Sequence, residues 1–425
     1  MMKKLRFGAI VLQDTSWDEQ VSRWQQAEKM GFDNLWIADH FVNYMAPSDP
    51  WFESWTLLAA MAANTKSIRI GTLVTAIPWR NPAFLAKQAL TVDHISNGRL
   101  ELGMGAGTPG HIEPGYKMTG IADWPPAERV ERFREVVQIV DQLLQNSVSS
   151  YDGQYYNLKD TAMSPASIQK PRPPITIGAL GPKMLKITAQ YADTWNTFGG
   201  HSGTVDEIFE DVRQGNDKLN QYCQEIERDP TTLRRSLLLF GSVAEACYGS
   251  SLDAFYEIIG KYQEIGFSDF ILYYPFMDAH MPAFERIVWE GIPTLKGERP
   301  KLFNKIKTAY RSYSSMGRKM TGGGGVKILS DVPKFDGPFT SIDELNSQSG
   351  ICAVMVLSDK VRQSFGLIDV VEAEDIKAQM QSHERESYWQ EKAQGEVLFS
   401  VHYAPEFERK ELMGRIEEKF KLSRA

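Results

Sequence analysis

The sequence of 425 residues predicts an α/β protein: a (β/α)8, or TIM, barrel with loop insertions over residues 1–300, then a small α+β module over residues 326–425. Two observations predict this division. As far as about residue 295, short apolar runs alternate with longer amphipathic runs, which is the pattern of parallel strands joined by helices. Beyond residue 300 that alternation stops. The chain is too long for one average domain but accommodates a barrel and an appended module.

Short apolar runs supply the expected barrel strands. They are Leu5–Leu12, Asn34–Ala38, Ile68–Thr75, Leu100–Gly105, Ile175–Ala179, Thr194–Phe198, Ser236–Val243 and Asp269–Tyr274. An open doubly wound sheet shows the same alternation. Eight strand–helix units in under 300 residues favour the closed barrel.

Amphipathic patterns with helical spacing lie between these strands. They include Trp17–Met30, Trp55–Asn64, Pro82–Ile95, Ala127–Leu144, Pro182–Tyr191 and Leu252–Ile265. Two longer segments interrupt the pattern: a loop rich in glycine and proline at 106–126, and an excursion rich in tyrosine and proline at 148–174. Because loops this long in a compact domain are usually functional, we expect lids or substrate walls there.

The module after residue 300 begins beyond a glycine-rich segment, Met320–Gly325, which has the composition of a flexible hinge. Its expected elements are strand-like Ile351–Leu357, apolar Phe365–Val371, charged helical Glu374–Gln394, strand Glu396–His402 and helix Pro405–Phe420. None of these segments contains a catalytic motif. The sequence therefore predicts a folded module without assigning it a role.

Composition narrows the possible partners. The net charge of −7 argues against a nucleic acid or an anionic membrane as partner. No apolar run approaches 18 residues, and no signal-peptide core follows the start. The three cysteines, Cys223, Cys247 and Cys352, are too widely spaced for a metal site or a disulfide framework. We therefore expect a cytoplasmic protein that binds small molecules and no metal.

Chemistry-bearing residues follow several of the expected strands, and the carboxyl ends of barrel strands meet at one rim, where barrel active sites lie. Asp39 and His40 follow the second strand, Leu73-Val74-Thr75 ends the third, and Gly105-Ala106-Gly107 ends the fourth. Imidazole both accepts and donates a proton near neutral pH. Glycine allows a ligand to approach the backbone closely.

The turn after the fifth strand, Gly178-Ala179-Leu180-Gly181-Pro182-Lys183, leads into a helix N-terminus. Unpaired N–H groups and the helix dipole make such a turn an anion site, although an ordinary strand–helix turn has the same appearance. Two tryptophans near strand ends, Trp79 and Trp195, are the expected walls of a substrate pocket.

The first 300 residues resemble the luciferase-like monooxygenase superfamily, whose barrels bind flavin or the deazaflavin coenzyme F420. The segments that carry the resemblance are Phe32–Phe41, Arg69–Thr75, Arg80–Lys87, Asp93–Gly107, Pro173–Ala179 with Gly181-Pro182-Lys183, and Ala192–Asn196. These matches occur in the family's order. The region beyond residue 300 lies outside the resemblance.

The resemblance implies roles for these residues. In the F420-using branch, the histidine at the position of His40 lies beside the reactive face of the deazaflavin and assists proton transfer. A cis peptide bond between Leu73 and Val74 would form a ledge behind the cofactor ring. The turn 178–183 would hold the cofactor's phosphate. Asp39, Thr75 and the residues Gly105, Ala106 and Gly107 would line the rest of the cofactor site.

One position departs from the family pattern. F420-dependent sugar-phosphate dehydrogenases carry a catalytic glutamate where this chain has Thr108, so the same substrate is not expected. Other branches place a glutamate slightly later in this loop, which makes Glu113 a catalytic candidate and His111 a cofactor-binding candidate.

The resemblance therefore implies an oxidoreductase that transfers hydride between F420 and a small organic substrate: an alcohol, an aldehyde or an activated alkene. Family members are commonly dimers, so we expect a homodimer. Two alternatives stay open. One is a monooxygenase that uses reduced FMN, and the other is a non-catalytic barrel scaffold that acts through residues 326–425. The loops that would determine the substrate contain no diagnostic pattern.

Overall fold

The computed structural model describes residues 3–44, 46–200, 202–249, 251–275 and 280–298 and, further on, 336–339, 342–345, 350–359, 364–381, 389 and 397–403. The chain divides into two compact units, Met1–Phe303 and Asn304–Ala425. The predicted hinge Met320–Gly325 and the predicted helix Pro405–Phe420 lie outside the described residues.

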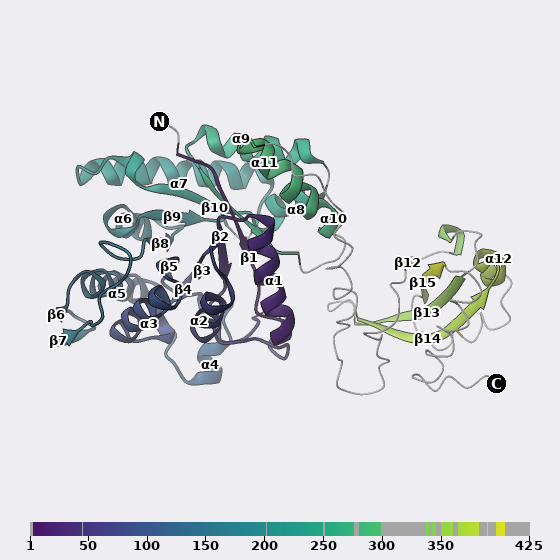
Figure 1. Cartoon of the computed structure of the whole chain (residues 1–425), viewed down its shortest axis with the longest axis horizontal. Coiled ribbons are helices and arrows are strands. Elements are labelled where there is room, and N and C mark those ends of the chain that lie inside the picture. The colour runs from purple at the N-terminus through teal and green to yellow at the C-terminus, as the bar shows by residue number, and fades with distance from the viewer. Residues whose placement is uncertain are drawn as a thin grey trace. The chain divides into compact units, whose positions relative to one another are not determined.

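The first unit is a closed parallel barrel surrounded by helices (Figure 1). Its strands, in hydrogen-bonded order, are β3 (Arg69–Thr72), β2 (Asn34–Ile37), β1 (Arg6–Ile10), β11 (Asp269–Tyr273), β10 (Arg234–Leu238), β9 (Thr194–Thr197), β8 (Ile175–Gly178), β5 (Leu100–Gly105) and β4 (Thr75–Ala76). Pairing of β3 with β5 closes the ring. Closure confirms the predicted barrel and excludes the open sheet.

The third strand position of the barrel is divided. The sequence predicts one strand over Ile68–Thr75, but β3 ends at Thr72, and β4 continues along β5 from Thr75. Between them, the peptide bond from Leu73 to Val74 is cis, which confirms that implication of the resemblance. Glycines on β5 make room for this segment: a Cβ on Gly103 would lie 1.8 Å from the Thr72 carbonyl oxygen.

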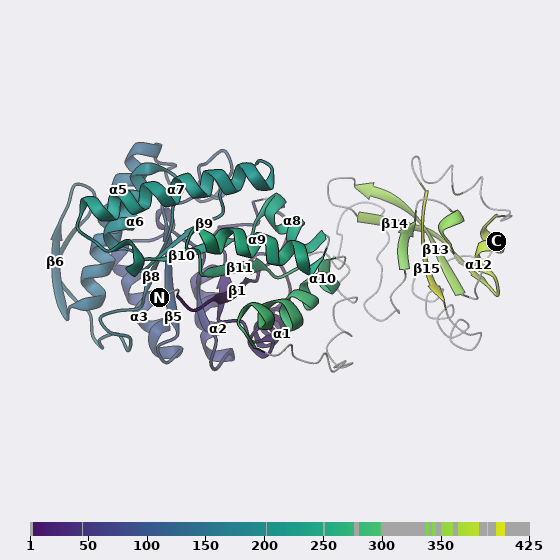
Figure 2. The ribbon, with the colours of Figure 1, turned by 90° about the horizontal axis from the view of Figure 1, so that it is seen from above.

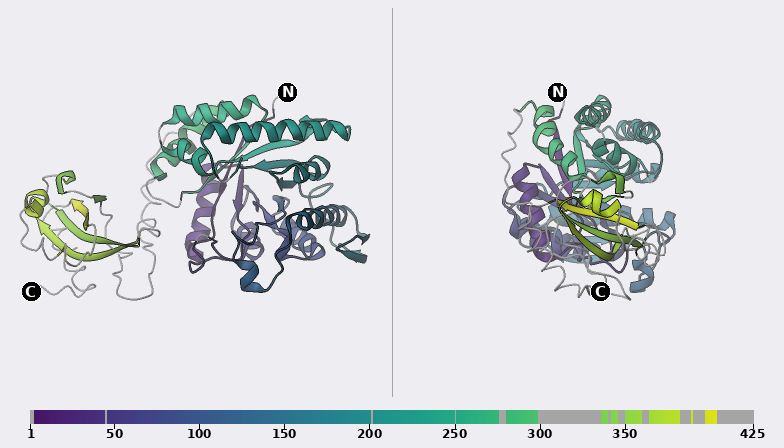
Figure 3. Two further views of the ribbon diagram at one scale, coloured as in Figure 1. Left: turned by 180° about the vertical axis from the view of Figure 1, so that it is seen from behind. Right: turned by 90° about the vertical axis from the view of Figure 1, so that its right-hand side faces the viewer.

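Helices cover the outside of the barrel (Figures 2 and 3). They are α1 (Trp17–Met30), α2 (Ser54–Asn64), η1 (Ile77–Trp79), α3 (Pro82–Ile95), α4 (Gly115–Thr119), α5 (Pro126–Gln145), α6 (Pro182–Tyr191), α7 (Val205–Glu225), η2 (Pro230–Thr232), α8 (Gly241–Gly249), α9 (Leu252–Glu264), α10 (Met281–Arg286), η4 (Ile287–Gly291) and α11 (Ile292–Leu295). The six helical patterns named above are confirmed within two residues at each end. Capping fixes several starts; for example, the Asn81 side chain accepts from the first turn of α3, where Pro82 needs no donor.

Three features differ from the sequence expectation. Strand β10 ends at Leu238, five residues before the predicted end, because Gly241 has a positive φ of 54° and begins α8. Helix α7 was not among the predicted patterns; a capping box of Thr204 and Glu207 starts it. The excursion at 148–174 contains an antiparallel hairpin, β6 (Val148–Asp152) and β7 (Asn157–Ala162).

Inside the barrel, Ile10, Trp36, Leu238 and Ile271 form a buried apolar cluster, each from a different strand. Four partly buried side chains pack against it, and they lie at or just beyond the carboxyl ends of the strands: Leu73, Phe198, Phe240 and Tyr273. The barrel is therefore filled, and the upper surface of its filling is apolar.

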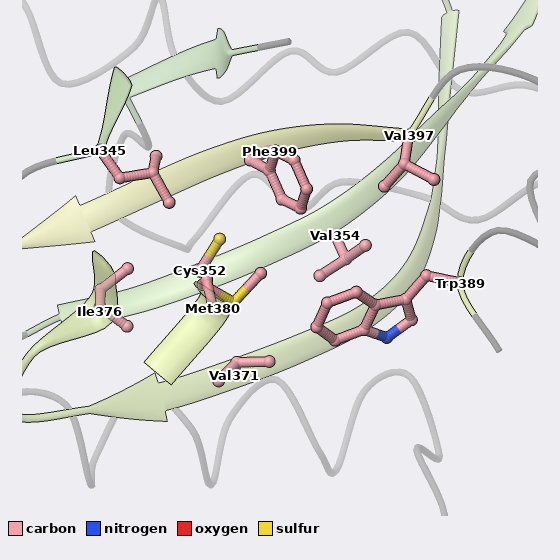
Figure 4. Close-up of a cluster of buried hydrophobic side chains, with 9 residues drawn as sticks. All are labelled: Leu345, Cys352, Val354, Val371, Ile376, Met380, Trp389, Val397 and Phe399. Carbon is pink, nitrogen blue, oxygen red and sulfur yellow. The ribbon is translucent and has the colours of Figure 1, made fainter. Parts of the chain in front are cut away.

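The second unit has its own antiparallel sheet, in the order β12 (Asp336–Phe339), β15 (Val397–Tyr403), β13 (Gly350–Asp359) and β14 (Ser364–Ala373), together with helix α12 (Ile376–Gln381). The predicted strands at 351–357, 365–371 and 396–402 are confirmed. Figure 4 shows its core: Leu345, Cys352, Val354, Val371, Ile376, Met380, Trp389, Val397 and Phe399. This composition agrees with the predicted α+β class.

Candidate active site

The predicted catalytic residues His40 and Glu113 meet at the carboxyl end of the barrel. His40 follows β2, and Glu113 lies in the loop after β5, 73 residues further along the chain. The Nδ1 atom of His40 lies 2.6 Å from Oε2 of Glu113. The Glu113 side chain is 2% exposed and that of His40 20%. The Gly115 N–H donates to the other carboxylate oxygen of Glu113 at 2.9 Å.

This contact determines which nitrogen of His40 is available. An ionised carboxylate only accepts hydrogen bonds, so Nδ1 carries the proton and donates it to Glu113. No described residue hydrogen-bonds Nε2. In the neutral imidazole, Nε2 is therefore a proton acceptor without a partner among the described residues.

The backbone around His40 is held by hydrogen bonds. The Ala38 carbonyl accepts from Gln13 Nε2 at 2.6 Å and from the Ser54 hydroxyl at 2.8 Å. The His40 carbonyl accepts from Trp51 Nε1 at 2.9 Å. Because both carbonyls are occupied, the peptide segment that carries the imidazole has a defined path.

Asp39, predicted to bind cofactor, is committed to contacts within the chain. Its side chain is buried and accepts the Ala76 N–H at 2.9 Å. Arg80 contacts both carboxylate oxygens, with Nη2 3.0 Å from Oδ1. The sequence predicts no role for Arg80. Its position just before Asn81, the N-cap of α3, gave no signal that its side chain reaches back to β2.

The glycines after β5 are explained by packing against neighbouring chain segments. A Cβ on Gly105 would lie 2.4 Å from Cγ2 of Val74, and Gly107 has a φ of 88°. A Cβ on Gly107 would also lie 2.9 Å from Cδ of Pro78. Ala106 lies between them, and His111 is exposed, whereas Glu113 in the same loop is buried. Contact of these glycines, Ala106 and His111 with a cofactor stays a prediction.

Aromatic rings surround the histidine–glutamate pair. The Tyr44 ring lies 4.9 Å from the imidazole of His40, and Trp79 stacks on Tyr116 at 4.8 Å. A Cβ on Gly115 would approach both Trp79 (3.0 Å) and Glu113 (2.7 Å), so the indole lies beside the pair. Burial and the nearby negative charge of Glu113 raise the pKa of Tyr44. The phenol therefore stays protonated near neutral pH.

Trp195, predicted as a second pocket wall, lies elsewhere. It is part of β9 rather than beyond it, and it is 1% exposed. Its indole N–H donates to the Ala179 carbonyl at 2.9 Å, and its ring packs near Phe267 and Gly215 of α7. Since side chains alternate along a strand, Trp195 faces the helices while Asn196 faces the interior. The ring is thus separate from the His40 site.

The predicted anion turn precedes α6. Gly181 is the N-cap, no side chain caps the helix, and Pro182 occupies the first turn. A Cβ on Gly181 would meet no atom within 4 Å, so the approach to these N–H groups is open. Residues Gly178, Ala179, Leu180 and Lys183 complete the turn. A cavity of about 250 Å³ lies beside it, between α6 and α7, with Leu180, Pro182 and Trp195 in its lining.

The described part of the chain shows no metal site, no reactive cysteine and no membrane-spanning helix. No group of three histidine, cysteine or acidic side chains is placed to hold a metal ion there. The three cysteines are buried and form no disulfide bond, and burial raises the pKa of the Cys247 thiol to about 12, which makes it unreactive. Among the described helices, none has the length and apolar composition needed to cross a membrane.

Residues 3–264 match the luciferase-like monooxygenase family. A 5,10-methylenetetrahydromethanopterin reductase of Archaeoglobus fulgidus is 32% identical over 191 residues, which cover 44% of this chain and 52% of the relative. An F420-dependent glucose-6-phosphate dehydrogenase of Amycolatopsis mediterranei is 29% identical over 213 residues, which cover 48% of this chain and 60% of the relative. The oxygenase component of a flavin-dependent trigonelline monooxygenase of Acinetobacter baylyi is 26% identical over 251 residues, which cover 58% of this chain and 66% of the relative.

The chain thus spans about half to two thirds of the length of these relatives. Among solved structures, the F420-dependent tetrahydromethanopterin reductase of Methanopyrus kandleri superimposes with a TM-score of 0.56 at 19% identity. That likeness covers 69% of this chain and 99% of the other, and it supports the barrel fold.

Proposed function

The chain belongs to the luciferase-like monooxygenase family, and on that premise we propose that it is an oxidoreductase which transfers hydride between coenzyme F420 and a small organic substrate. An alcohol, an aldehyde or an activated alkene is the expected substrate class. The observation that carries the proposal is the His40–Glu113 pair, a buried carboxylate on Nδ1 of an imidazole whose Nε2 faces no described partner. Relatives named for F420 support the choice of cofactor.

The residues present fit such a cofactor. A planar ring needs an apolar floor, which the partly buried side chains Leu73, Phe198, Phe240 and Tyr273 provide. A phosphate needs unpaired N–H groups, and the uncapped start of α6 at Gly181 offers them. Leu73, Val74 and the turn 178–183 would hold the cofactor, whereas Thr75, also predicted there, is buried and hydrogen-bonded to Trp55 and Thr72. When bound, the deazaflavin accepts or gives the hydride.

The chain's own residues handle the proton. During alcohol oxidation, the carbon-bound hydrogen leaves with its electron pair, the C=O bond forms, and the hydroxyl proton moves to Nε2 of His40. In the reverse direction, Nε2–H returns that proton to the carbonyl oxygen. The Glu113 carboxylate fixes the imidazole orientation and stabilises the positive charge that His40 gains. Tyr44 and Trp79 would shield the pair from water.

A monooxygenase that uses reduced FMN is the second candidate. One specific observation favours it: the match with the trigonelline monooxygenase component covers 58% of this chain, against 48% for the glucose-6-phosphate dehydrogenase. In that reaction, His40 would again serve as the proton-handling group. The non-catalytic scaffold is less favoured, because a scaffold has no need for a buried carboxylate that orients a histidine. A homodimer and a cytoplasmic location remain predictions.

Titration of the purified protein with F420 and, separately, with FMN tests the proposal through tryptophan fluorescence. We expect saturable binding of F420 that weakens when Lys183 is replaced by Ala. Preferential binding of FMN would move the assignment to the oxygen-using reaction. If neither compound bound, the barrel would have to be a scaffold.

A further inference from the structure

We infer that Arg80 is a positioning residue, which acts through Asp39 to fix His40 relative to the segment Leu73–Ala76. The inference rests on the proposed role of His40. It also gives Asp39 a different task from the one the sequence suggested, because that carboxylate lies inside the protein. Arg80 is the C-cap of η1 and lies two residues before the start of α3, so it belongs to the third strand–helix unit of the barrel, whereas Asp39 and His40 belong to the second.

The contact between the two units is a forked ion pair. Both terminal nitrogens of Arg80 face the two oxygens of Asp39, and their side chains are 9% and 3% exposed. A guanidinium that meets a carboxylate through two parallel bonds restricts rotation of both groups. The remaining partner of Arg80 is Glu53, at 2.6 Å from Nη2, and Glu53 is more than half exposed. Asp39 is therefore the partner that the buried guanidinium holds.

Asp39 also accepts the backbone N–H of Ala76 at 2.9 Å. Ala76 belongs to β4, which begins two residues after Leu73, the residue that would support the cofactor ring. One carboxylate thus joins three places: the peptide next to His40, the β4 backbone and Arg80. The distance between the His40 imidazole and the Leu73-Val74 segment, which would support the cofactor ring, therefore depends on the contacts of the Asp39 carboxylate.

The other hydrogen bonds around His40 do not connect its peptide segment to β4. The carbonyls of Ala38 and His40 are bound by Gln13, Ser54 and Trp51, which belong to the loop after β1 and the approach to α2. None of those contacts involves β4. Glu113 orients the imidazole ring but approaches from the loop after β5. Among Ala38, Asp39 and His40, Asp39 is therefore the residue whose side chain hydrogen-bonds the β4 backbone, while Trp55 of α2 reaches the Thr75 side chain of β4.

The test compares Arg80→Lys, which keeps the charge but removes the fork, with Asp39→Asn, which keeps the shape but removes the charge. We expect Arg80→Lys to lower kcat by about 10- to 100-fold with less than a threefold change in KM, since small misplacement of a catalytic group has effects of that size. Glu53→Gln is the matched control, because it removes the exposed partner of Arg80, and we expect less than a twofold change in kcat.

A second readout separates this inference from the proposed function. The ring resonances of His40, assigned by their loss in His40→Asn, report its environment by NMR whether or not a substrate is known. In Arg80→Lys and Asp39→Asn we expect these resonances to shift or broaden while far-UV circular dichroism stays unchanged. Unchanged His40 resonances in both folded variants would overturn the inference. If Arg80→Lys did not fold, the His40 resonances of Asp39→Asn alone would test the inference. Shifted resonances with full activity in His40→Asn would instead overturn the proposed function.

Discussion

The two ends of the barrel both contain buried charges, but they use them differently. At the amino end, Arg6 lies 2.6 Å from Glu101 and 3.4 Å from Asp269, and Arg69 lies 2.5 Å from Glu101. These residues begin or nearly begin their strands. Each charge there lies against an opposite charge, so the network has nothing to offer a ligand.

At the carboxyl end, the Asp39–Arg80 pair is closed in the same way, but the His40–Glu113 pair is not. Glu113 is buried, whereas His40 is one fifth exposed and keeps Nε2 available. Buried charge alone therefore does not identify the site. The site is identified by an oriented side chain with one polar atom that has no partner within the described residues, and barrel enzymes place such a group at the carboxyl end.

The largest effect that follows from this contrast is on catalysis by His40→Asn. General acid–base groups contribute about 10²- to 10⁴-fold to rates, so we expect kcat to fall by about that factor. Stability should change little, because the imidazole is partly exposed. Steady-state kinetics and urea unfolding measure the two quantities. A variant that keeps more than half of the wild-type kcat would remove His40 from the mechanism.

The converse result is expected at the amino end. Glu101→Gln leaves Arg6 and Arg69 facing each other without their shared carboxylate. Breaking a buried ion pair costs about 3–5 kcal/mol, so the free energy of unfolding should fall by that amount. The kcat of the folded fraction, measured well below the melting temperature, should stay within twofold. A large kcat loss without a stability loss would contradict the division between the two ends.

Glu113→Gln should have an intermediate effect, on catalysis only. The amide can still accept from Nδ1, but it cannot balance the charge that Nε2 acquires with the proton. We expect kcat to fall by about 10- to 100-fold. Steady-state kinetics measure this loss. A kcat within twofold of the wild-type value would show that Glu113 only supports the loop.

The smallest effect is the pH dependence of stability from Asp269. Burial raises its pKa to about 6, against the smaller opposing influence of Arg6. The native state then binds more protons than the unfolded chain between about pH 4 and 6, so stability falls as pH rises through that interval, by about 2–3 kcal/mol. Asp269→Asn should abolish this slope in chemical unfolding and leave the pH–kcat profile unchanged. An altered pH–kcat profile in Asp269→Asn would contradict the separation between the two ends.

The barrel could be predicted because its strands are continuous apolar runs, and their alternation with amphipathic helices has few other solutions. Helix α7 was not named among the expected helices, although its buried apolar residues Ile208, Val212, Leu219 and Cys223 have the spacing of one helix face. Trp195 lies within β9 and lines the cavity between α6 and α7, so its assignment as a substrate wall stays a prediction.

The site could be predicted in part for a related reason. Strand ends bring His40 and the loop after β5 to one rim, and the resemblance to the family indicated Glu113. The Arg80–Asp39 contact joins residues 41 positions apart in different strand–helix units. No local pattern predicts such an ion pair, because it depends on the path of the chain through β4 and η1.

The proposed mechanism requires that Nε2 of His40 carries no proton and lies beside the bound cofactor. The most direct test is an NMR measurement of the two ring nitrogens of His40 near neutral pH, with and without F420. We expect that Nδ1 carries the proton, that Nε2 does not, and that the Nε2 signal moves on saturation with F420 while the signal of exposed His94, in the last turn of α3, stays unchanged. A proton on Nε2, or a His40 signal indifferent to both F420 and FMN, would contradict it.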